Sequence, residues 1–193
     1  MISRIKSERV NLSNYRQAAK AARAEGWGQV PRAKLMMLYL PWRRTMGPAA
    51  TPLTLGLPWL SIPAISFLKA YLKPHMKVCE FGCGGSTIFF ARRVREVVSI
   101  EHDQEWYAQV QKLLADQALH NVQMLLRAPE TAAPFEPPEL AFEPNSYRST
   151  SPPYSTHIFY RYASAIDLFP DAHFDLVLVD GRARPSCLKH NAV

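Results

Sequence analysis

From Lys77 onward, short apolar runs alternate with amphipathic stretches. Apolar runs of five to seven residues predict buried strands, and the amphipathic stretches between them predict helices. This alternation is typical of βαβ units, in which helices cover both faces of a parallel sheet. The predicted strands are Lys77–Phe81, Glu96–Glu101, Val122–Leu126 and Phe174–Asp180, and the predicted helices are Ser86–Val94, Asp103–Leu119 and about Thr156–Leu168.

The segment before Lys77 has a different, helical pattern interrupted by prolines. Alanine-rich or amphipathic runs that end at glycine or proline predict short helices. The predicted helices are Asn14–Glu25, a run that begins at Pro31 and ends at Pro41, and Pro63–Leu72. We therefore expect residues 1–58 to form a basic helical extension with a proline-rich linker, and residues 59–193 to form one α/β domain.

A long segment, Ala128–Pro153, separates the third predicted strand from the last predicted helix. It contains seven prolines and several acidic residues. Proline removes backbone donors, so this composition predicts a loop without regular structure. A loop of this length inside a compact domain is usually functional or mobile.

The composition is that of a globular protein, with 48% hydrophobic and 20% charged residues. The net charge of +7 is unevenly distributed. Residues 1–77 carry 13 basic and two acidic side chains, a net +11, whereas residues 78–193 carry 10 basic and 14 acidic side chains, a net −4. The basic character therefore belongs to the extension, which we expect to be a solvated cap, with nucleic acid or an acidic protein as the alternative partner.

Three cysteines, Cys79, Cys83 and Cys187, form neither a Cys-x-x-Cys pair nor a zinc-binding pattern with histidines. We expect reduced thiols, no metal site and a cytoplasmic location. Thr45–Leu68 lacks charged side chains, but its four prolines exclude a membrane-spanning helix. The first ten residues lack the apolar stretch of a secretory signal, although their composition also suits an organellar transit peptide.

Candidate chemistry begins where the first strand runs into Gly82-Cys83-Gly84-Gly85-Ser86-Thr87 and then a helix. Glycines at such a turn allow a tight bend and close approach of a nucleotide. A dinucleotide fingerprint requires glycine where Thr87 stands, which opposes NAD. Two acids, Glu80 before the turn and Glu101 at the end of the next strand, instead suit a ligand with a ribose and an amino group.

Val78-Cys79-Glu80-Phe81-Gly82-Cys83-Gly84, followed by Ser99-Ile100-Glu101-His102-Asp103, resembles the opening motifs of class I S-adenosylmethionine-dependent methyltransferases. The resemblance covers about Trp59 to Val193 and implies a Rossmann-like sheet of strand order 3-2-1-4. It implies that Glu80 helps to hold the methionine amino end, that Glu101 binds the ribose and that His102 lies near the adenine. The turn residues Gly82, Cys83, Gly84 and Ser86 would shape the cofactor site.

Phe174-Asp175-Leu176-Val177-Leu178-Val179-Asp180-Gly181-Arg182 resembles the family's fourth strand and the acidic turn beside the reactive methyl group. The resemblance implies that Asp180 orients the acceptor or takes a proton from it. As alternatives, the acids would be capping or surface residues and Asp180-Gly181 an ordinary turn. Arg182 and Arg184 would bind an anionic substrate or simply be solvated.

Ser151-Pro152-Pro153-Tyr154 also resembles the active-site motif of amino-methyltransferases that act on adenine or glutamine. That motif follows a strand, and the polar, proline-broken Leu140–Thr150 does not predict one. We therefore expect Tyr154, Tyr160 and Tyr162 to pack against the neighbouring helix or to border the acceptor pocket.

The family fold has seven strands, and only thirteen residues follow Asp180. We therefore expect a fragment, a shortened reading frame or a chain completed by a partner, with the fourth strand as an apolar edge. The leading hypothesis is a methyltransferase that uses S-adenosylmethionine and a small-molecule acceptor. The alternatives are a nucleoside-binding or interaction module without turnover and an NAD-dependent oxidoreductase; acceptor identity and oligomeric state stay open.

Overall fold

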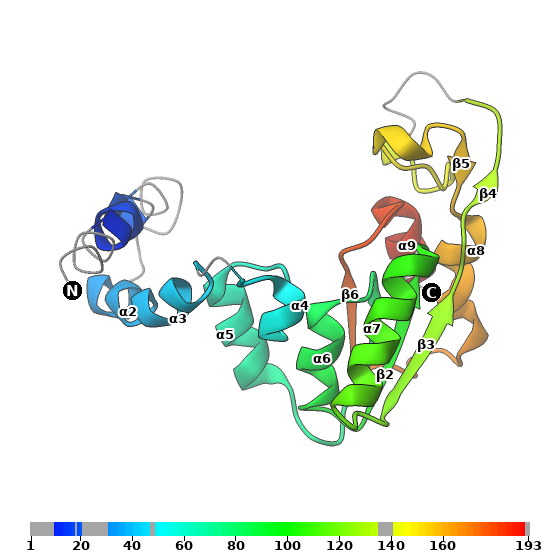
Figure 1. The fold of residues 1–193 in the computed structure, drawn as a ribbon. Helices are drawn as coiled ribbons and strands as arrows, with labels where there is room; N and C mark the ends of the chain where they lie inside the picture. The colour runs from blue at the N-terminus through cyan, green and yellow to red at the C-terminus, as the bar shows by residue number, and fades with distance from the viewer. Residues whose placement is uncertain (1–9, 18, 21–30, 47–48, 135–140, 192–193) are drawn as a thin grey trace.

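A computed structural model describes residues 10–17, 19–20, 31–46, 49–134 and 141–191. Four parallel strands form its central sheet, in the order β3-β2-β1-β6 (Figure 1). They are β1 (Lys77–Phe81), β2 (Glu96–Glu101), β3 (Val122–Leu126) and β6 (Leu176–Val179). The predicted Rossmann-like α/β fold and its strand order are therefore confirmed, with β6 as the fourth predicted strand.

The register brings three strand ends to one edge of the sheet. Phe81, at the end of β1, lies opposite Ile100 of β2 and Val179 of β6. Because parallel strands present their carboxyl ends on the same side, the turns that follow β1, β2 and β6 are neighbours in space. This edge is where an open α/β sheet binds ligands.

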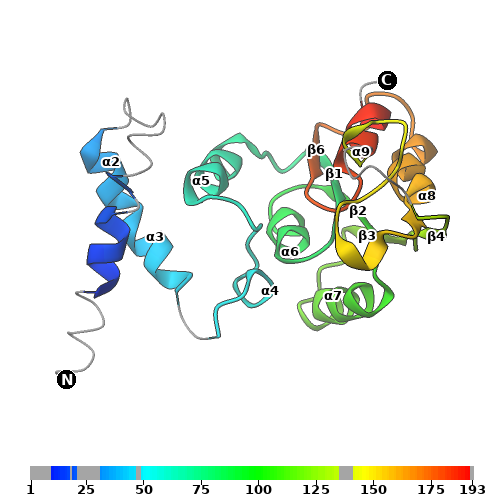
Figure 2. The same cartoon turned by 90° about the horizontal axis from the view of Figure 1, so that it is seen from above.

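Alternating side chains of β1 point into two hydrophobic cores, as expected from the two-residue period of a strand. Val78 packs with α5 (Ile62–Tyr71) and α6 (Gly85–Ala91) on one face. Cys79 and Phe81 pack on the other face with α8 (Tyr160–Ala163) and α9 (Arg184–Asn191). Figure 2 shows these two helical layers on either side of the sheet, with α7 (Gln104–Asp116) beside α6.

Two predictions about the segment between β3 and β6 are wrong. Glu130–Thr131 (β4) pairs antiparallel with His157–Ile158 (β5). The predicted irregular loop Ala128–Pro153 therefore contains a strand, and the helix predicted from about Thr156 begins later, after β5. The β-branched and aromatic residues around Ile158 favour an extended backbone, and the partner strand fixes it. The remaining elements are short: η3 (Pro152–Tyr154), α8 (Tyr160–Ala163) and η4 (Ser164–Leu168).

The N-terminal region is helical, as predicted, but Pro41 does not end its helix. Residues 10–17 and 19–20 are helical, and the rest of the predicted Asn14–Glu25 helix lies outside the described residues. The run after Pro31 forms α2 (Arg32–Met37) and α3 (Tyr39–Arg44), separated at Leu38. Pro41 lies in the first turn of α3, where a missing N–H is tolerated, and its only effect is this interruption.

The predicted proline-rich linker contains a short helix, α4 (Pro52–Leu55), which packs against α6. Thr51 and Thr54 cap it through reciprocal hydrogen bonds. A side chain at Gly85 would meet the carbonyl oxygens of Pro52 and Leu57 at 2.1 and 2.3 Å, so only glycine allows this contact. Among the described residues, no helix is long and apolar enough to cross a membrane.

Candidate functional site

The glycine turn after β1 is held by backbone contacts on both sides. Gly82 has a φ of 96°, a conformation that favours glycine, and its N–H donates to the carbonyl of Ile100 at 2.8 Å. A Cβ at Gly82 would stand 3.1 Å from the Cα of Gly181, in the turn after β6. The turn therefore lies against the ends of both neighbouring strands and has little freedom to move.

Glu80 lies beneath this turn and is fully buried. Its Oε1 accepts hydrogen bonds from the hydroxyls of Thr87 and Ser99, while its Oε2 has no partner among the described residues. Burial raises the pKa of Glu80 to about 7, although the nearby hydroxyls of Ser86, Thr87 and Ser99 act to lower it. Thr87 Oγ1 also accepts from the N–H of Gly84 at 2.9 Å, so Glu80, Thr87 and the turn form one connected unit.

Glu101 connects the turn to the end of β2 and is 2% exposed. Its Oε2 accepts from the N–H of Cys83 at 2.9 Å, and its Oε1 accepts from the N–H groups of His102 and Asp103 at 2.7 and 2.9 Å. Burial acts to raise the pKa of Glu101, but the neighbouring His102 imidazole and the backbone N–H groups of Asp103 and Cys83 outweigh it and leave the pKa below its usual value. Glu101 is therefore an ionised carboxylate at neutral pH.

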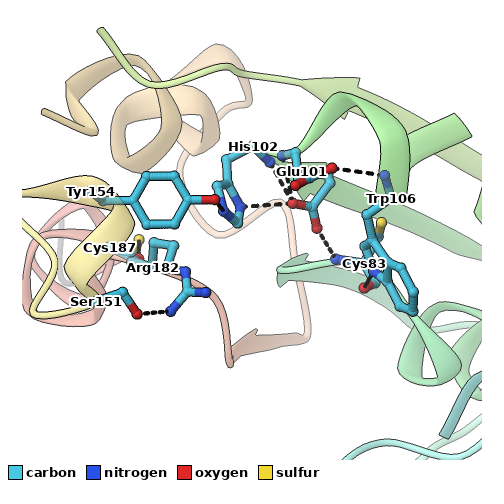
Figure 3. A network of polar contacts seen from close by, with 9 residues as sticks. Cys83, Glu101, His102, Trp106, Ser151, Tyr154, Arg182 and Cys187 are labelled. Atoms are coloured by element: carbon cyan, nitrogen blue, oxygen red, sulfur yellow. Dashed lines mark hydrogen bonds and ion pairs between the residues drawn. The ribbon is translucent and has the colours of Figure 1, made fainter. Parts of the chain in front are cut away.

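His102 extends this network away from the turn (Figure 3). Its Nδ1 lies 2.7 Å from Glu101 Oε1, and its Nε2 lies 3.0 Å from the hydroxyl of Tyr154. The imidazole therefore lies between the carboxylate of Glu101 and the phenol of Tyr154, and the tautomer of the ring sets which group donates to the other. The rings of Tyr154, Phe159 and Tyr162 surround the imidazole edge-on.

Two cavities meet at the glycine turn. One, of about 410 Å³, lies on the β2 side and is lined by Glu101, His102 and Tyr154. The other, of about 290 Å³, lies on the α4 side. Gly82, Trp106 and Asp180 line both, and Cys83, Gly84 and Ser86 line the second. Of the predicted site residues, only Glu80 lines neither of these two cavities.

Asp180, at the carboxyl end of β6, is ion-paired. Its Oδ1 lies 2.9 Å from the guanidinium of Arg184, which also donates to the Asp180 carbonyl. Burial raises the pKa of Asp180, and Arg184 acts in the opposite direction. Arg184 is therefore a partner of the predicted catalytic acid and is not simply solvated.

Tyr154 and Arg182 both line the first cavity, and Arg182 links this cavity to Ser151, which does not line it. The Arg182 guanidinium donates to Ser151 Oγ at 2.5 Å and stands 5.2 Å from the centre of the Tyr154 ring (Figure 3). The motif that carries them forms η3 and, among the described residues, follows no strand directly. Tyr162 is instead fully buried beside Gly181, and Tyr160 is exposed.

Two parts of the site were not predicted from the sequence: Trp106, which lines both cavities, and residues of Thr51–Trp59 that line the second cavity. Trp106 lies in the first turn of α7, and its indole N–H donates to the Cys83 carbonyl at 2.7 Å. An aromatic residue three positions after the helix-capping Asp103 was the available signal, because the cap places it beside the turn. Nothing in the sequence of Thr51–Trp59 indicated that it lines the second cavity.

The three cysteines are free and buried. Burial raises the pKa of the Cys79, Cys83 and Cys187 thiols, so they are protonated and poorly nucleophilic at neutral pH. In the part of the chain that the structure describes, no three histidine, cysteine or acidic side chains are grouped as metal ligands would be.

A family model of protein-L-isoaspartate(D-aspartate) O-methyltransferases matches residues 6–131, well over half of the chain. The chain belongs to this family. Its Rossmann-like fold is that of the class I methyltransferases, as the sequence motifs implied. The match includes the glycine turn, Glu101 and His102, and ends at β4, before Tyr154 and Asp180.

Three solved structures of low similarity are also matched, two of which are named as a methyltransferase or a methyltransferase-like protein. A methyltransferase-like protein from Silicibacter pomeroyi is 22% identical, with 70% of this chain and 67% of that chain covered and a TM-score of 0.46. The YcgJ protein of Bacillus subtilis is 14% identical, with 60% and 36% covered and a TM-score of 0.35. The 23S rRNA methyltransferase ErmE is 27% identical, with 30% and 23% covered and a TM-score of 0.25.

The chain thus spans well under two thirds of the length of the YcgJ and ErmE structures. No curated protein matches the sequence.

Proposed function

We propose that this methyltransferase takes its methyl group from S-adenosylmethionine and transfers it to a small-molecule acceptor. The observation that carries the proposal is the pair of cavities that meet at Gly82, with an ionised Glu101 in one and Asp180 shared by both. Membership of a methyltransferase family supports the reaction class. The acceptor stays a matter of proposal.

The residues present fit the proposed cofactor. Oε2 of Glu101 accepts one hydrogen bond from the described residues, so it retains a lone pair for a ribose hydroxyl. Trp106, His102 and Tyr154 supply the aromatic surface that an adenine requires in the same cavity. On the other side of Gly82, the carboxylate of Asp180 faces a cavity with Trp59 and Trp106, a suitable setting for a cationic sulfonium.

S-adenosylmethionine, when bound, supplies a methyl group on a positively charged sulfur, ready for direct displacement. The role of the protein is then to position the methyl group and the acceptor in line, because such a displacement needs little covalent help from side chains. Gly82 and Trp106 would fix the ligand between the two cavities, and Asp180 would orient the acceptor or take its proton. Its ion pair with Arg184 keeps Asp180 in place and offsets part of the rise in pKa that burial causes.

The alternative of a dinucleotide cofactor is opposed by the start of α6. A pyrophosphate binds to free N–H groups at a helix N-terminus. Here the N–H of Gly84 donates to Thr87, and the carbonyls of Pro52 and Leu57 lie directly over Gly85. Negative phosphate groups would face these carbonyl oxygens, which repel them.

Calorimetric titration with S-adenosylhomocysteine tests the proposal, with NAD titrated in parallel. We expect S-adenosylhomocysteine to bind more tightly than NAD. Glu101→Ala removes the ribose acceptor and should weaken binding about tenfold to a hundredfold, because hydrogen bonds to a charged group contribute about 1.5–3 kcal/mol. Circular dichroism of each variant establishes that it is folded.

Glu96→Ala is the matched control. Glu96 lies at the opposite end of the same strand, away from both cavities, and its ion-pair partners among the described residues are the half-buried Lys77 and His173. Its loss should leave ligand binding unchanged. A folded wild-type chain that binds neither ligand, or that prefers NAD, would overturn the proposal.

A further inference from the structure

The helices at the N-terminus stand apart from the α/β domain in both views of the fold (Figures 1 and 2). We call the described residues of 10–46 the N-terminal arm. The arm consists of the helical residues 10–17 and 19–20 and of the two helices α2 and α3. None of the cavities at the glycine turn is lined by it. The methyltransferase site therefore assigns no role to the arm.

Aromatic side chains hold the arm together internally. Tyr15, from the first helical segment, is 7% exposed and packs edge-on against Tyr39 and at an angle on Trp42 of α3, with ring centres 5.3 and 5.2 Å apart. Tyr39 and Trp42 also face each other at 6.1 Å. These rings are occupied with one another and are unavailable as a stacking platform for bases.

Flexible aliphatic side chains, in contrast, are exposed on the second half of the arm. Met37 is 76% and Leu40 64% exposed, and Met36 is also exposed. Leu38, which separates α2 from α3, keeps a right-handed helical backbone conformation, so Leu40 follows Met36 and Met37 at helical spacing and the three side chains lie on one side of the arm. Water-exposed groups of this size are unfavourable in solution, and a cluster of them marks a contact surface.

The charge of this region indicates what the surface contacts. The first 77 residues carry 13 basic side chains and only two acidic ones, Glu8 and Glu25. Within the described arm, Arg16 and Arg44 are exposed. A partner must therefore be anionic, and it must also accept aliphatic side chains. An interface of anionic lipid headgroups over acyl chains has both properties.

We propose that the N-terminal arm binds an anionic lipid surface, with Met37 and Leu40 inserted at the headgroup boundary and the basic side chains among the headgroups. Nucleic acid would use exposed aromatic rings, which the arm lacks among its described residues, and would leave the aliphatic side chains in water. A second copy of the chain would bring the same net positive charge to the contact. This role is independent of the proposed methyl transfer.

Cosedimentation of the full chain with vesicles tests the proposal. The probes are vesicles of phosphatidylcholine alone and vesicles of phosphatidylcholine with phosphatidylglycerol in a three-to-one ratio. We expect binding to the anionic vesicles only, weakened by added salt. The double variant Met37→Ser and Leu40→Ser should reduce that binding at least about tenfold, because each lost methylene weakens insertion. Arg16→Gln with Arg44→Gln should also weaken it and reduce its dependence on salt.

The matched control is Leu168→Ser with Leu188→Ser, two exposed leucines on the α/β domain. It should bind vesicles like the wild type. Equal loss in this control would overturn the assignment to the arm, as would failure of the folded wild type to bind anionic vesicles. RNA binding that survives the Met37 and Leu40 changes, without vesicle binding, would assign the arm to nucleic acid instead. A dimer that these changes dissolve, without vesicle binding, would assign it to self-association.

Discussion

Glu80→Gln should remove a dependence of stability on pH. Glu80 is fully buried beneath the glycine turn, and one of its oxygens has no partner among the described residues. Glutamine reproduces the shape of the neutral acid and keeps an oxygen for the hydroxyls of Thr87 and Ser99. The change therefore tests the charge of Glu80 and not its packing.

The sign and size follow from the pKa of the carboxyl group. Burial raises the pKa of Glu80 from 4.5 to about 7. Between these two values the unfolded chain has lost the proton and the folded chain still holds it, so the free energy of unfolding falls as pH rises. The loss is complete above the folded pKa and amounts to about 3 kcal/mol over the window, at about 1.4 kcal/mol per pH unit.

Urea titrations of wild type and Glu80→Gln, at intervals from pH 4.5 to pH 8, measure this effect. The difference between their free energies of unfolding cancels most contributions from other groups. Relative to the variant, wild type should lose about 3 kcal/mol across the series. Glu105→Gln, an exposed change on α7, should give a constant difference.

A flat difference for Glu80→Gln would refute the reasoning. It would mean that the folded and unfolded states lose the Glu80 proton at the same pH. In that case the three-way arrangement of Glu80, Thr87 and Ser99 either solvates the charge fully or admits water.

Two further changes test how the turns are built. Gly181→Ala places a methyl group 2.0 Å from the Tyr162 hydroxyl, so the free energy of unfolding measured by thermal denaturation should fall by about 1–3 kcal/mol. Adding Tyr162→Phe should restore part of this loss, and an unchanged melting temperature in Gly181→Ala would contradict the packing. Thr87→Val leaves the Gly84 N–H without a partner and leaves Glu80 Oε1 with Ser99 as its one remaining donor among the described residues, so it should cost about 1–3 kcal/mol in urea titrations. Thr87→Ser should cost much less, and equal losses would show that the hydroxyl is not the important group.

The sheet could be predicted from the sequence because its pattern is local. β1, β2 and β3 begin and end at the predicted residues, since each is a short apolar run bounded by a turn or by polar residues. β6 is shorter than predicted, because Asp175 bonds to Lys77 through both its N–H and its carboxylate outside the strand. β4 and β5 were missed because each has two residues and exists only through the other.

The position of each acid in the site was harder to predict. Glu101 is the last residue of β2 and Glu80 is one residue before the end of β1, and no local pattern indicated which of the two acids would line a cavity. The structure puts Glu80 under the turn, with Thr87 and Ser99, and leaves Glu101 on the wall of a cavity. Their predicted roles in cofactor binding stay predictions.

By itself, then, the sequence determined where the strands of the sheet and the glycine turn lie, because these depend on residues close together in the chain. The strand order was implied by the resemblance of two motifs to class I methyltransferases, and the structure confirms it. Only the tertiary structure decided that Tyr154 meets His102, that Arg184 pairs with Asp180 on the shared cavity edge, and that α4 lies over Gly85. Apart from the ion pair, these contacts join residues about 30 to 50 positions apart. Burial and partner choice at such distances depend on the packing of whole elements, which no local pattern specifies.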